Sequence, residues 1–411
     1  MTKRTVGRGS RRPLLAMVAV VGLPVLLVLP AGEAAATLEA PGAPPRVPVP
    51  ALPQHCRAAP SWVDATPDST ASPAPGLTVR TWSGAGGDRV PLRVVAAEAD
   101  TVRINVSVAV PARFGAVLDT TELVGRSGAV VGVNGDYFES GAAGAVPRGV
   151  EVQHGVVLFG PAGSTKAVGV GVDGAVHAGY VHVTGNVVTT GAGPAVRLPV
   201  TSVNVASPAS SGVAVQTAYG SAQPRRGTWF VRVRGGTVVS SSPHDPGRPT
   251  GGDLLVMAPA AARAALAKVA VGAHVEVTTG VQGADGVGLT EAVGSSSPVL
   301  TGGAVVVACT GSYGTGWRPR TVVAWDNRRA RVWLITINAT SSGASGTGVR
   351  GVTYGEAADL ARRLGATGAV LLDGGHSTTA ALRERGGVRR IDVPASARMR
   401  PVPDGVVLAP A

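Results

Sequence analysis

The pattern of apolar and polar positions is clearest between residues 351 and 379, where it predicts a helix, a buried strand and a polar turn in succession. Thr353 and Glu356 have the spacing of a capping box, in which each side chain accepts a hydrogen bond from the other residue's backbone N–H. Gly365 is placed to end the helix in the left-handed conformation. Between these signals the apolar residues recur at the spacing of one helix face, at Ala357, Leu360, Ala361 and Leu364. We therefore expect an amphipathic helix that covers a sheet.

The run 369–372 is continuous, apolar and too short for a helix, so it predicts a buried strand. Asp373 follows directly, and Gly374 and Gly375 leave room for a ligand to approach the backbone. His376 and the hydroxyl residues Ser377, Thr378 and Thr379 come next. A carboxylate at the rim of a sheet is a candidate catalytic group, but most Asp-Gly pairs only form tight turns. Both interpretations are open on this segment alone.

A second segment repeats this arrangement. The apolar strand 129–133 leads directly into Asn134, Gly135 and Asp136. Asn-Gly is also the strongest short hairpin signal, so a bare turn is the alternative. Two strands that each end in polar side chains and glycine would line one cleft. We therefore predict that Asn134 and Asp373 lie in a shared cleft.

The chain from residue 77 onward consists mostly of short β-type runs separated by turn residues. Asn204 lies between valines in a half-buried strand position. Arg320 precedes the strand 322–325, and the planar fork of an arginine bonds two oxygens at once, as a phosphate or carboxylate clamp requires. The more common alternative is a solvated arginine at a sheet edge. The overall pattern predicts an α+β fold, with mixed, β-rich sheets and a few covering helices in a single catalytic domain at 77–411.

The first 36 residues have the features of a secretory signal: a basic start, an apolar run over 13–30 and a small-residue cleavage pattern at 34–36. The pair Arg11 and Arg12 also resembles a twin-arginine signal. A retained signal anchor is the alternative, because the apolar run is about long enough to span a bilayer. We expect a secreted or cell-envelope protein with no stable membrane span if the signal is cleaved.

Residues 37–76 are rich in Pro and Ala, a composition that predicts an extended spacer. Cys56 in this segment and Cys309 far downstream are the only two cysteines. In an oxidising compartment an isolated pair usually bonds, so we expect a disulfide, with two unpaired thiols as the alternative.

The formal net charge is +12, and five of the positive residues lie within the first 12 positions. The remaining basic residues are scattered, with no basic run interleaved with aromatic residues. This pattern argues against nucleic acid as a partner and is compatible with an anionic substrate.

With these motifs in place, the chain resembles the phosphodiester glycosidase family, known for removing N-acetylglucosamine from a phosphodiester. The resemblance runs from about residue 77 to the C-terminus and depends on the order of the motifs. They are Asn134–Phe138 followed by Gly149, Val203-Asn204, Arg320-Thr321, Gly351–Thr353 with Glu356, and Leu372–Thr378. His376 departs from the family pattern, which has a third glycine there. It puts an imidazole beside the candidate carboxylate or narrows the pocket.

The resemblance implies a hydrolase that cleaves a sugar-1-phosphodiester, of the N-acetylglucosamine-1-phosphate type, at the bond between sugar and phosphate. Asp373 is then the base or nucleophile, and Asp136 is a second catalytic carboxylate. The implied substrate-binding residues are Asn134, Gly135, Gly149, Asn204, Arg320, Gly374, Gly375, His376 and Ser377. The implied partner is a phosphodiester-linked glycan or sugar phosphate.

Two alternatives belong to other classes of function. A non-catalytic cell-envelope module would bind a phosphodiester-containing polysaccharide through the same cleft. A metal-dependent phosphodiesterase is less favoured, because the seven His residues include no close pair with metal-ligand spacing. We expect no cofactor, with a divalent cation held by Asp136 and Asp373 as an open alternative.

Overall fold

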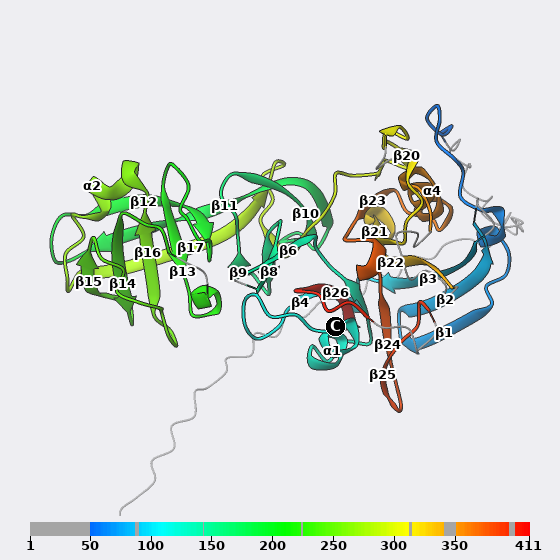
Figure 1. Ribbon diagram of the computed structural model, residues 1–411, viewed down its shortest axis with the longest axis horizontal. Helices are drawn as coiled ribbons and strands as arrows, with labels where there is room; N and C mark the ends of the chain where they lie inside the picture. Colours follow the sequence, from blue (N-terminus) through cyan, green and yellow to red (C-terminus); the bar gives the residue numbers. More distant parts are fainter. Residues whose placement is uncertain are drawn as a thin grey trace, which may run out of the picture. The chain divides into compact units, whose positions relative to one another are not determined.

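Antiparallel strands form most of the structure. The computed structural model describes residues 50–86, 90–142, 144–222, 225–311, 315–340, 351–393 and 399–411, and the predicted signal segment lies outside these ranges. The strands form sheets of eight, eleven, five and two strands, accompanied by short helices (Figure 1). The predicted β-rich α+β fold is confirmed.

The eight-stranded sheet contains the strand that ends at Asp373. Its central pairs are antiparallel, with Val322 opposite Leu371. In spatial order its strands are β1 (Ser69–Ala74), β2 (Leu77–Ala85), β3 (Pro91–Asp100), β22 (Arg331–Ala339), β21 (Arg320–Asp326), β23 (Gly368–Leu371), β19 (Leu300–Thr301) and β20 (Ala304–Val305). The 3-10 helix η4 (Asn327–Arg329) forms the turn between β21 and β22.

Helix α4 (Tyr354–Arg363) lies against β21, β22 and β23 of this sheet (Figure 1). The predicted capping box is present: Glu356 N donates to Thr353 Oγ1 at 3.2 Å, and Thr353 N donates to Glu356 Oε2 at 2.8 Å. Gly365 follows the helix with φ +102°. The predicted apolar face, including Ala357, Leu360 and Ala361, is buried in a core with β21 and β22. Local sequence signals therefore fix this helix and the face that it buries.

The eleven-stranded sheet contains a closed ring. An additional pairing between β11 and β12 joins the ends of a seven-strand run, β12-β13-β16-β14-β15-β17-β11. Closure removes sheet edges, and the ring is filled mostly by buried valines. The ring strands are β12 (Val196–Val203), β13 (Val213–Gln216), β16 (Leu254–Ala258), β14 (Trp229–Arg234), β15 (Thr237–Ser242), β17 (His274–Gly283) and β11 (Val176–Thr190).

The remaining strands of this sheet continue from β11 in the order β10 (Ser164–Gly171), β18 (Leu289–Gly294), β8 (Glu151–Gln153) and β9 (Val156–Phe159). Around the ring lie α2 (Arg263–Leu266) and the 3-10 helices η2 (Tyr219–Ala222) and η3 (Ala260–Ala262). Strands β10 and β18 bring residues of this sheet to the candidate site.

The five-stranded sheet contains the strand that ends at Asn134. Its order is β25 (Gly387–Arg390), β24 (Ala380–Glu384), β5 (Val131–Asn134), β26 (Gly405–Pro410) and β4 (Ile104–Ala109). Helix α1 (Thr120–Arg126) packs on β5 and β24. The hairpin of β6 (Phe138–Gly141) and β7 (Gly144–Pro147) follows β5. In β26, Gly405 is opposite Asn134, so the C-terminal strand reaches the same point as β5.

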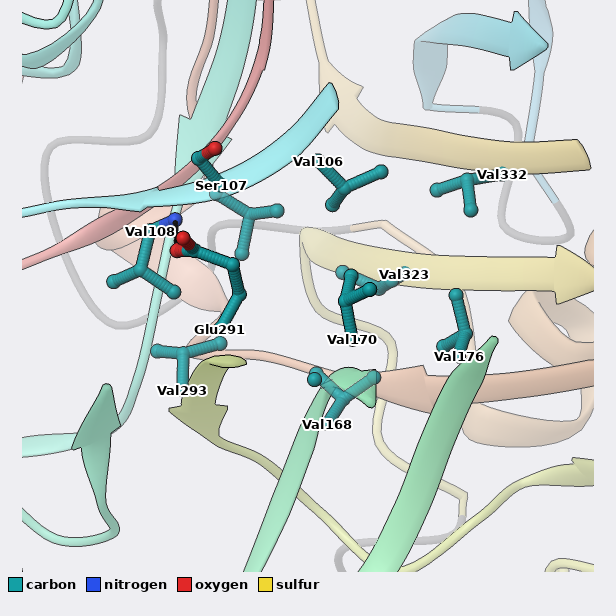
Figure 2. A pocket seen from close by; sticks show the side chains of 12 residues that line it. Val106, Ser107, Val108, Val168, Val170, Val176, Glu291, Val293, Val323 and Val332 are labelled. Atoms are coloured by element: carbon teal, nitrogen blue, oxygen red, sulfur yellow. Dashed lines mark hydrogen bonds between the residues drawn. The ribbon is translucent and has the colours of Figure 1, made fainter. Parts of the chain in front are cut away.

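A valine-lined cavity of about 20 Å³ lies among β4, β10, β18, β21 and β22 (Figure 2). It has the size of one or two water molecules. Glu291 is the one carboxylate on its wall, and its Oε2 already accepts a hydrogen bond from Val108 N at 2.8 Å. The cavity is therefore part of the packed interior and offers no free chemical group.

Residues 50–76 differ from the extended spacer that the composition predicts. They form the 3-10 helix η1 (Ser61–Asp64) and β1, and Ala59 and Val63 are buried in the core beneath α4. The predicted disulfide is present, because Cys56 and Cys309 are bonded with their Cα atoms 4.9 Å apart. The disulfide and these small apolar contacts hold the segment on the body. The domain limits 1–36, 37–76 and 77–411 stay a prediction.

No helix among the described residues is long and apolar enough to cross a membrane.

Candidate active site

The ends of β5 and β23 meet, as predicted, although the two strands belong to different sheets. Asn134 Nδ2 donates to the carbonyl of Asp373 at 2.7 Å, and Asp373 N donates to the carbonyl of Gly135 at 3.0 Å. Asn134 Oδ1 also accepts bonds from Thr321 Oγ1 at 2.7 Å and Thr379 N at 3.2 Å. Asn134 is fully buried and its amide is used by the protein itself. It holds the two strand ends together, and the structure does not offer it as a contact for sugar.

A cleft of about 740 Å³ opens at this meeting point. This volume lies in the range of ligand sites, about 300–1,000 Å³. Its wall carries the two predicted carboxylates, Asp136 and Asp373, together with predicted Gly149. It also carries three cations that sequence reasoning did not assign to the site, Arg148, Lys166 and Arg400.

Asp373 stands at the surface of the cleft, with its side chain 17% exposed. Its Oδ2 accepts a hydrogen bond from Ser377 Oγ at 2.6 Å and lies 3.6 Å from Arg400 Nη1. Burial raises the pKa of this carboxyl above its ordinary value, and the bond from Ser377 and the charge of Arg400 act against that rise. Asp373 is thus a partly exposed carboxylate with a hydroxyl donor and a cation beside it.

Asp136 has a different environment, because it is only 2% exposed. Its Oδ2 accepts a bond from Gly149 N at 2.5 Å, and its own N–H donates to Asp404 Oδ1 at 2.6 Å. The carboxylate rests against Gly294, where any side chain would collide with it. Burial and the neighbouring Asp404 raise the pKa of Asp136 well above its ordinary value. The proton-carrying form of Asp136 is therefore favoured.

Two further carboxyls, Asp404 and Glu151, lie behind Asp136. Both are buried, and their mutual interaction adds to the effect of burial on Glu151, whose pKa is raised well above its ordinary value. Burial raises the pKa of Asp404 to about 6. Asp404 also packs against Gly135, which has no room for a Cβ. Sequence reasoning missed Asp404, because an Asp-Gly pair before a C-terminal strand looks like an ordinary turn.

Arg400 is the cation next to Asp373. Its Nη1 donates to Ser377 Oγ at 3.0 Å, and its guanidinium lies 4.4 Å from the centre of the Phe138 ring. The side chain is 43% exposed, so its remaining N–H groups reach the cleft. Arg148 on the same wall forms a 3.2 Å ion pair with Glu139. These two arginines supply positive charge beside the candidate carboxylate.

Arg320 does not line the cleft as the sequence suggested. It is 7% exposed, and its guanidinium donates to the carbonyls of Val352 at 3.1 Å and Gly316 at 2.8 Å. Its guanidinium carbon lies 4.3 Å from the centre of the Tyr354 ring, and Tyr354 lines the cleft. A buried arginine bonds nearby carbonyls because leaving its donors unsatisfied would be costly. Arg320 therefore supports a cleft residue from behind.

Asn204 also lies outside the set of residues that line the cleft. It follows β12 with φ +55° and is fully buried. Its Nδ2 donates to the carbonyl of Leu158 at 2.8 Å, and its Oδ1 accepts a bond from Thr217 N at 2.7 Å. The amide thus joins the ends of β9, β12 and β13. The half-buried strand pattern could not show that its polar groups are satisfied inside the sheet.

The turn after Asp373 has the backbone freedom that its glycines suggested. A side chain at Gly374 would collide with the carbonyl of Pro319, and Gly375 has φ +61°. Residues Gly375–Ser377 form the 3-10 helix η5, in which His376 is exposed and Ser377 is buried. Ser377 contacts both Asp373 and Arg400, whereas His376 is not one of the residues lining the cleft.

Within the described ranges, no group of three or more His, Cys, Asp or Glu side chains is arranged to hold a metal ion. The expected absence of a cofactor stays a prediction.

The site is a cleft with one partly exposed carboxylate, one buried carboxyl whose pKa is raised, and several cations on its wall. Residues 227–409 match the family described as phosphodiester glycosidase, which is the family that the sequence motifs resemble. The matched range includes Asp373, Ser377 and Arg400, while Asn134 and Asp136 precede it.

Solved structures with a similar fold include a hypothetical protein from Synechocystis, at 19% identity and a TM-score of 0.61. The match covers 84% of this chain and 64% of that one, so this chain spans less than two thirds of its length. A putative exported protein from Burkholderia pseudomallei matches at 20% identity and a TM-score of 0.56, covering 78% of this chain and 74% of that one.

The catalytic domain of zebrafish N-acetylglucosamine-1-phosphodiester alpha-N-acetylglucosaminidase, auto-inhibited by its pro-peptide, aligns more distantly. Identity is 12%, the TM-score is 0.44, and the alignment covers 84% of this chain and 87% of that one. No protein with a curated function matches the chain.

Proposed function

We propose that this protein is an exported phosphodiester glycosidase that hydrolyses a sugar-1-phosphodiester at the bond between the anomeric carbon and phosphate. The sugar is of the N-acetylglucosamine type. The family match supports the reaction class. The observation that carries the proposal is the placement of Asp373, which faces the cleft with Ser377 and Arg400 against its Oδ2.

Asp373 promotes attack on the anomeric carbon. It is either the base that takes a proton from the attacking water molecule or the nucleophile itself. In the direct hydrolysis, water forms the new bond to the anomeric carbon and gives its proton to Asp373. The bond from that carbon to the phosphate oxygen breaks, and its electron pair stays on the oxygen. The hydrogen bond from Ser377 orients the carboxylate of Asp373. The raised pKa of Asp373 makes this carboxylate a stronger base than an exposed aspartate.

Asp136 supplies the proton that the leaving phosphate oxygen takes up. Its burial and the charge of Asp404 raise its pKa and so favour the protonated form, which is the form that a general acid requires. A phosphate monoester takes up its last proton near pH 6 and leaves without much assistance. The contribution of Asp136 is therefore smaller than that of the acid in an ordinary glycosidase.

Arg400 and Arg148 bind the phosphate. Arg400 takes the role that the sequence suggested for Arg320, because its guanidinium is exposed beside Asp373. Charge on the phosphate oxygens grows as the bond to the sugar breaks, so fixed cations stabilise the transition state more than the ground state.

The proposed location is the cell envelope or the exterior, based on the signal-like residues 1–36. The Cys56–Cys309 disulfide supports an oxidising compartment. The second candidate function, a non-catalytic module that binds phosphodiester polysaccharide, uses the same cations and requires no turnover.

The deciding experiment incubates the full mature chain with methyl N-acetylglucosamine-1-phosphodiester and follows release of the free sugar, with and without chelator. The proposal expects hydrolysis that Asp373→Asn abolishes. Binding of the diester without hydrolysis by the parent protein would support the binding module and overturn the enzyme. The anomer formed first, followed by NMR, shows whether Asp373 acts through water or as nucleophile.

A further inference from the structure

Lys166 and Tyr180 form a pair on the cleft wall that the proposed chemistry does not use. They lie directly opposite each other on β10 and β11, and the lysine nitrogen is 5.4 Å from the centre of the tyrosine ring. Both line the same cleft as Asp373. The pair therefore offers a flat aromatic face and a positive charge to whatever occupies that part of the cleft.

Tyr180 is unusual in its exposure. It is 57% exposed, and the other large exposed apolar side chains among the described residues are all valines. An exposed aromatic ring does not contribute to the packed core of the protein. Its apolar face can instead pack on the C–H groups of a sugar ring. Its place in a cleft wall makes the ring available to a bound saccharide.

Lys166 is one of three lysines in a chain that otherwise uses arginine. Within the part of the chain that the structure describes, no carboxylate forms an ion pair with Lys166. Lys166 is half-buried, and its ammonium group lies over the Tyr180 ring. An unpaired cation in a cleft is suited to an anionic group of a ligand.

The backbone connects this pair to the catalytic strand. The carbonyl of Lys166 accepts a bond from Ser295 N at 3.1 Å, and Ser296 N donates to the carbonyl of Leu371 at 2.8 Å. Leu371 is two residues before Asp373. The cleft lining between Lys166 and Asp373 includes three residues that carry hydroxyl groups, Ser295, Ser296 and Ser297.

We infer that Lys166 and Tyr180 form a subsite for the group on the far side of the scissile phosphate, and that this group is a second sugar carrying its own phosphate. This inference depends on the proposed function and narrows its substrate to a repeating glycosyl phosphodiester. The second ring stacks on Tyr180, its phosphate pairs with Lys166, and the scissile phosphate lies at Arg400 near Asp373.

The test compares three ligands with the full chain and its variants Lys166→Met and Tyr180→Ala. The first ligand is methyl N-acetylglucosamine-1-phosphodiester, the second adds a neutral sugar beyond the phosphate, and the third adds a sugar that carries a second phosphate. Lys268→Met is the matched control, because Lys268 is exposed and lies outside the cleft lining.

We expect Lys166→Met to raise KM about tenfold for the doubly phosphorylated ligand only, and Tyr180→Ala to raise it about fivefold for both larger ligands. Values for the methyl diester and for Lys268→Met should stay within about twofold of the parent. Equal effects on all three ligands, or none, would overturn the subsite. Calorimetric affinities of the same ligands separate the two proposals. Without turnover in the parent protein the catalytic function fails, while the subsite is still judged by the affinity differences.

Discussion

Asp373 and Asp136 follow apolar strands in the same way along the sequence, yet the structure gives them opposite surroundings. Asp373 has a 17% exposed side chain, with a hydroxyl and an arginine against one oxygen. Asp136 is 2% exposed and has a second carboxylate, Asp404, against its backbone N–H. Burial raises the pKa of both, and the pKa of Asp136 is raised further by the neighbouring charge of Asp404.

In the proposed mechanism, this difference makes Asp373 the base and Asp136 the acid. Ser377 and Arg400 stabilise the charged form of the partly exposed Asp373, whereas burial and the charge of Asp404 favour the neutral form of Asp136. Environments that separate the pKa values of two carboxyls assign them different roles in catalysis. The predictions below test that assignment.

The largest effect is expected from Asp373→Asn. The change keeps the size of the side chain and removes the charge, so turnover of a glycosyl phosphodiester should fall at least 100-fold, or about 2.7 kcal/mol in barrier. The thermal midpoint should change little, because the site is partly exposed. Hydrolysis at the parent rate by a folded variant would show that Asp373 is not the catalytic group.

Asp136→Asn should lower turnover less, by roughly tenfold for a good phosphate leaving group. The loss should grow when the alcohol side makes the phosphate a poorer leaving group, because the missing proton then matters more. Comparing the parent and the variant on a series of diesters measures this trend. A loss that is the same for all leaving groups would assign Asp136 a structural role.

Arg400→Lys and Arg320→Lys form a matched pair. Arg400→Lys loses the planar fork beside Asp373, so we expect kcat/KM to fall about tenfold, through a lower kcat as well as a higher KM, with an unchanged thermal midpoint. Arg320→Lys leaves buried carbonyls without donors and should lower the midpoint by roughly 3 °C or more, with a smaller effect on KM. If Arg320→Lys alone raised KM, the clamp suggested by the sequence would be correct after all.

Asp404→Asn should have the smallest effect, visible mainly in pH dependence. The pKa of Asp404 is raised to about 6 in the folded protein, so its contribution to stability is fully present below pH 3.8 and is lost as the pH rises through about 6. The variant should show a shallower fall in the urea midpoint between these pH values. Removing the charge also lowers the pKa of Asp136, so the alkaline limb of the pH–rate profile should move to lower pH. Identical pH–rate profiles for the variant and the parent would show that Asp404 does not influence the pKa of Asp136.

Much of the secondary structure could be predicted from short-range sequence signals. The capping box at Thr353 and Glu356, the apolar stripe of α4 and the buried run before Asp373 all depend on neighbours within a few residues. The convergence of the ends of β5 and β23 was also predictable, because both are apolar strands that end in glycine and polar side chains. The pairing of Cys56 with Cys309 followed from there being only two cysteines.

The orientation of individual side chains was decided by the tertiary structure. Arg320 and Asn204 have suitable chemistry, but buried carbonyls and amides take up their polar groups. Arg400 and Asp404 had no distinguishing local pattern. They belong to the site because the C-terminal segment lies beside β5.

The sequence by itself determined the family resemblance, the β-rich secondary structure and the two candidate carboxylates, since these depend on local pattern and on the order of motifs. Only the tertiary structure decided which carboxyl is partly exposed and which is buried with a strongly raised pKa. The pKa of Asp136 depends on its burial and on Asp404, which is 268 positions away along the chain. Charge interactions act through space, so their effects appear only when the folded chain brings those groups together.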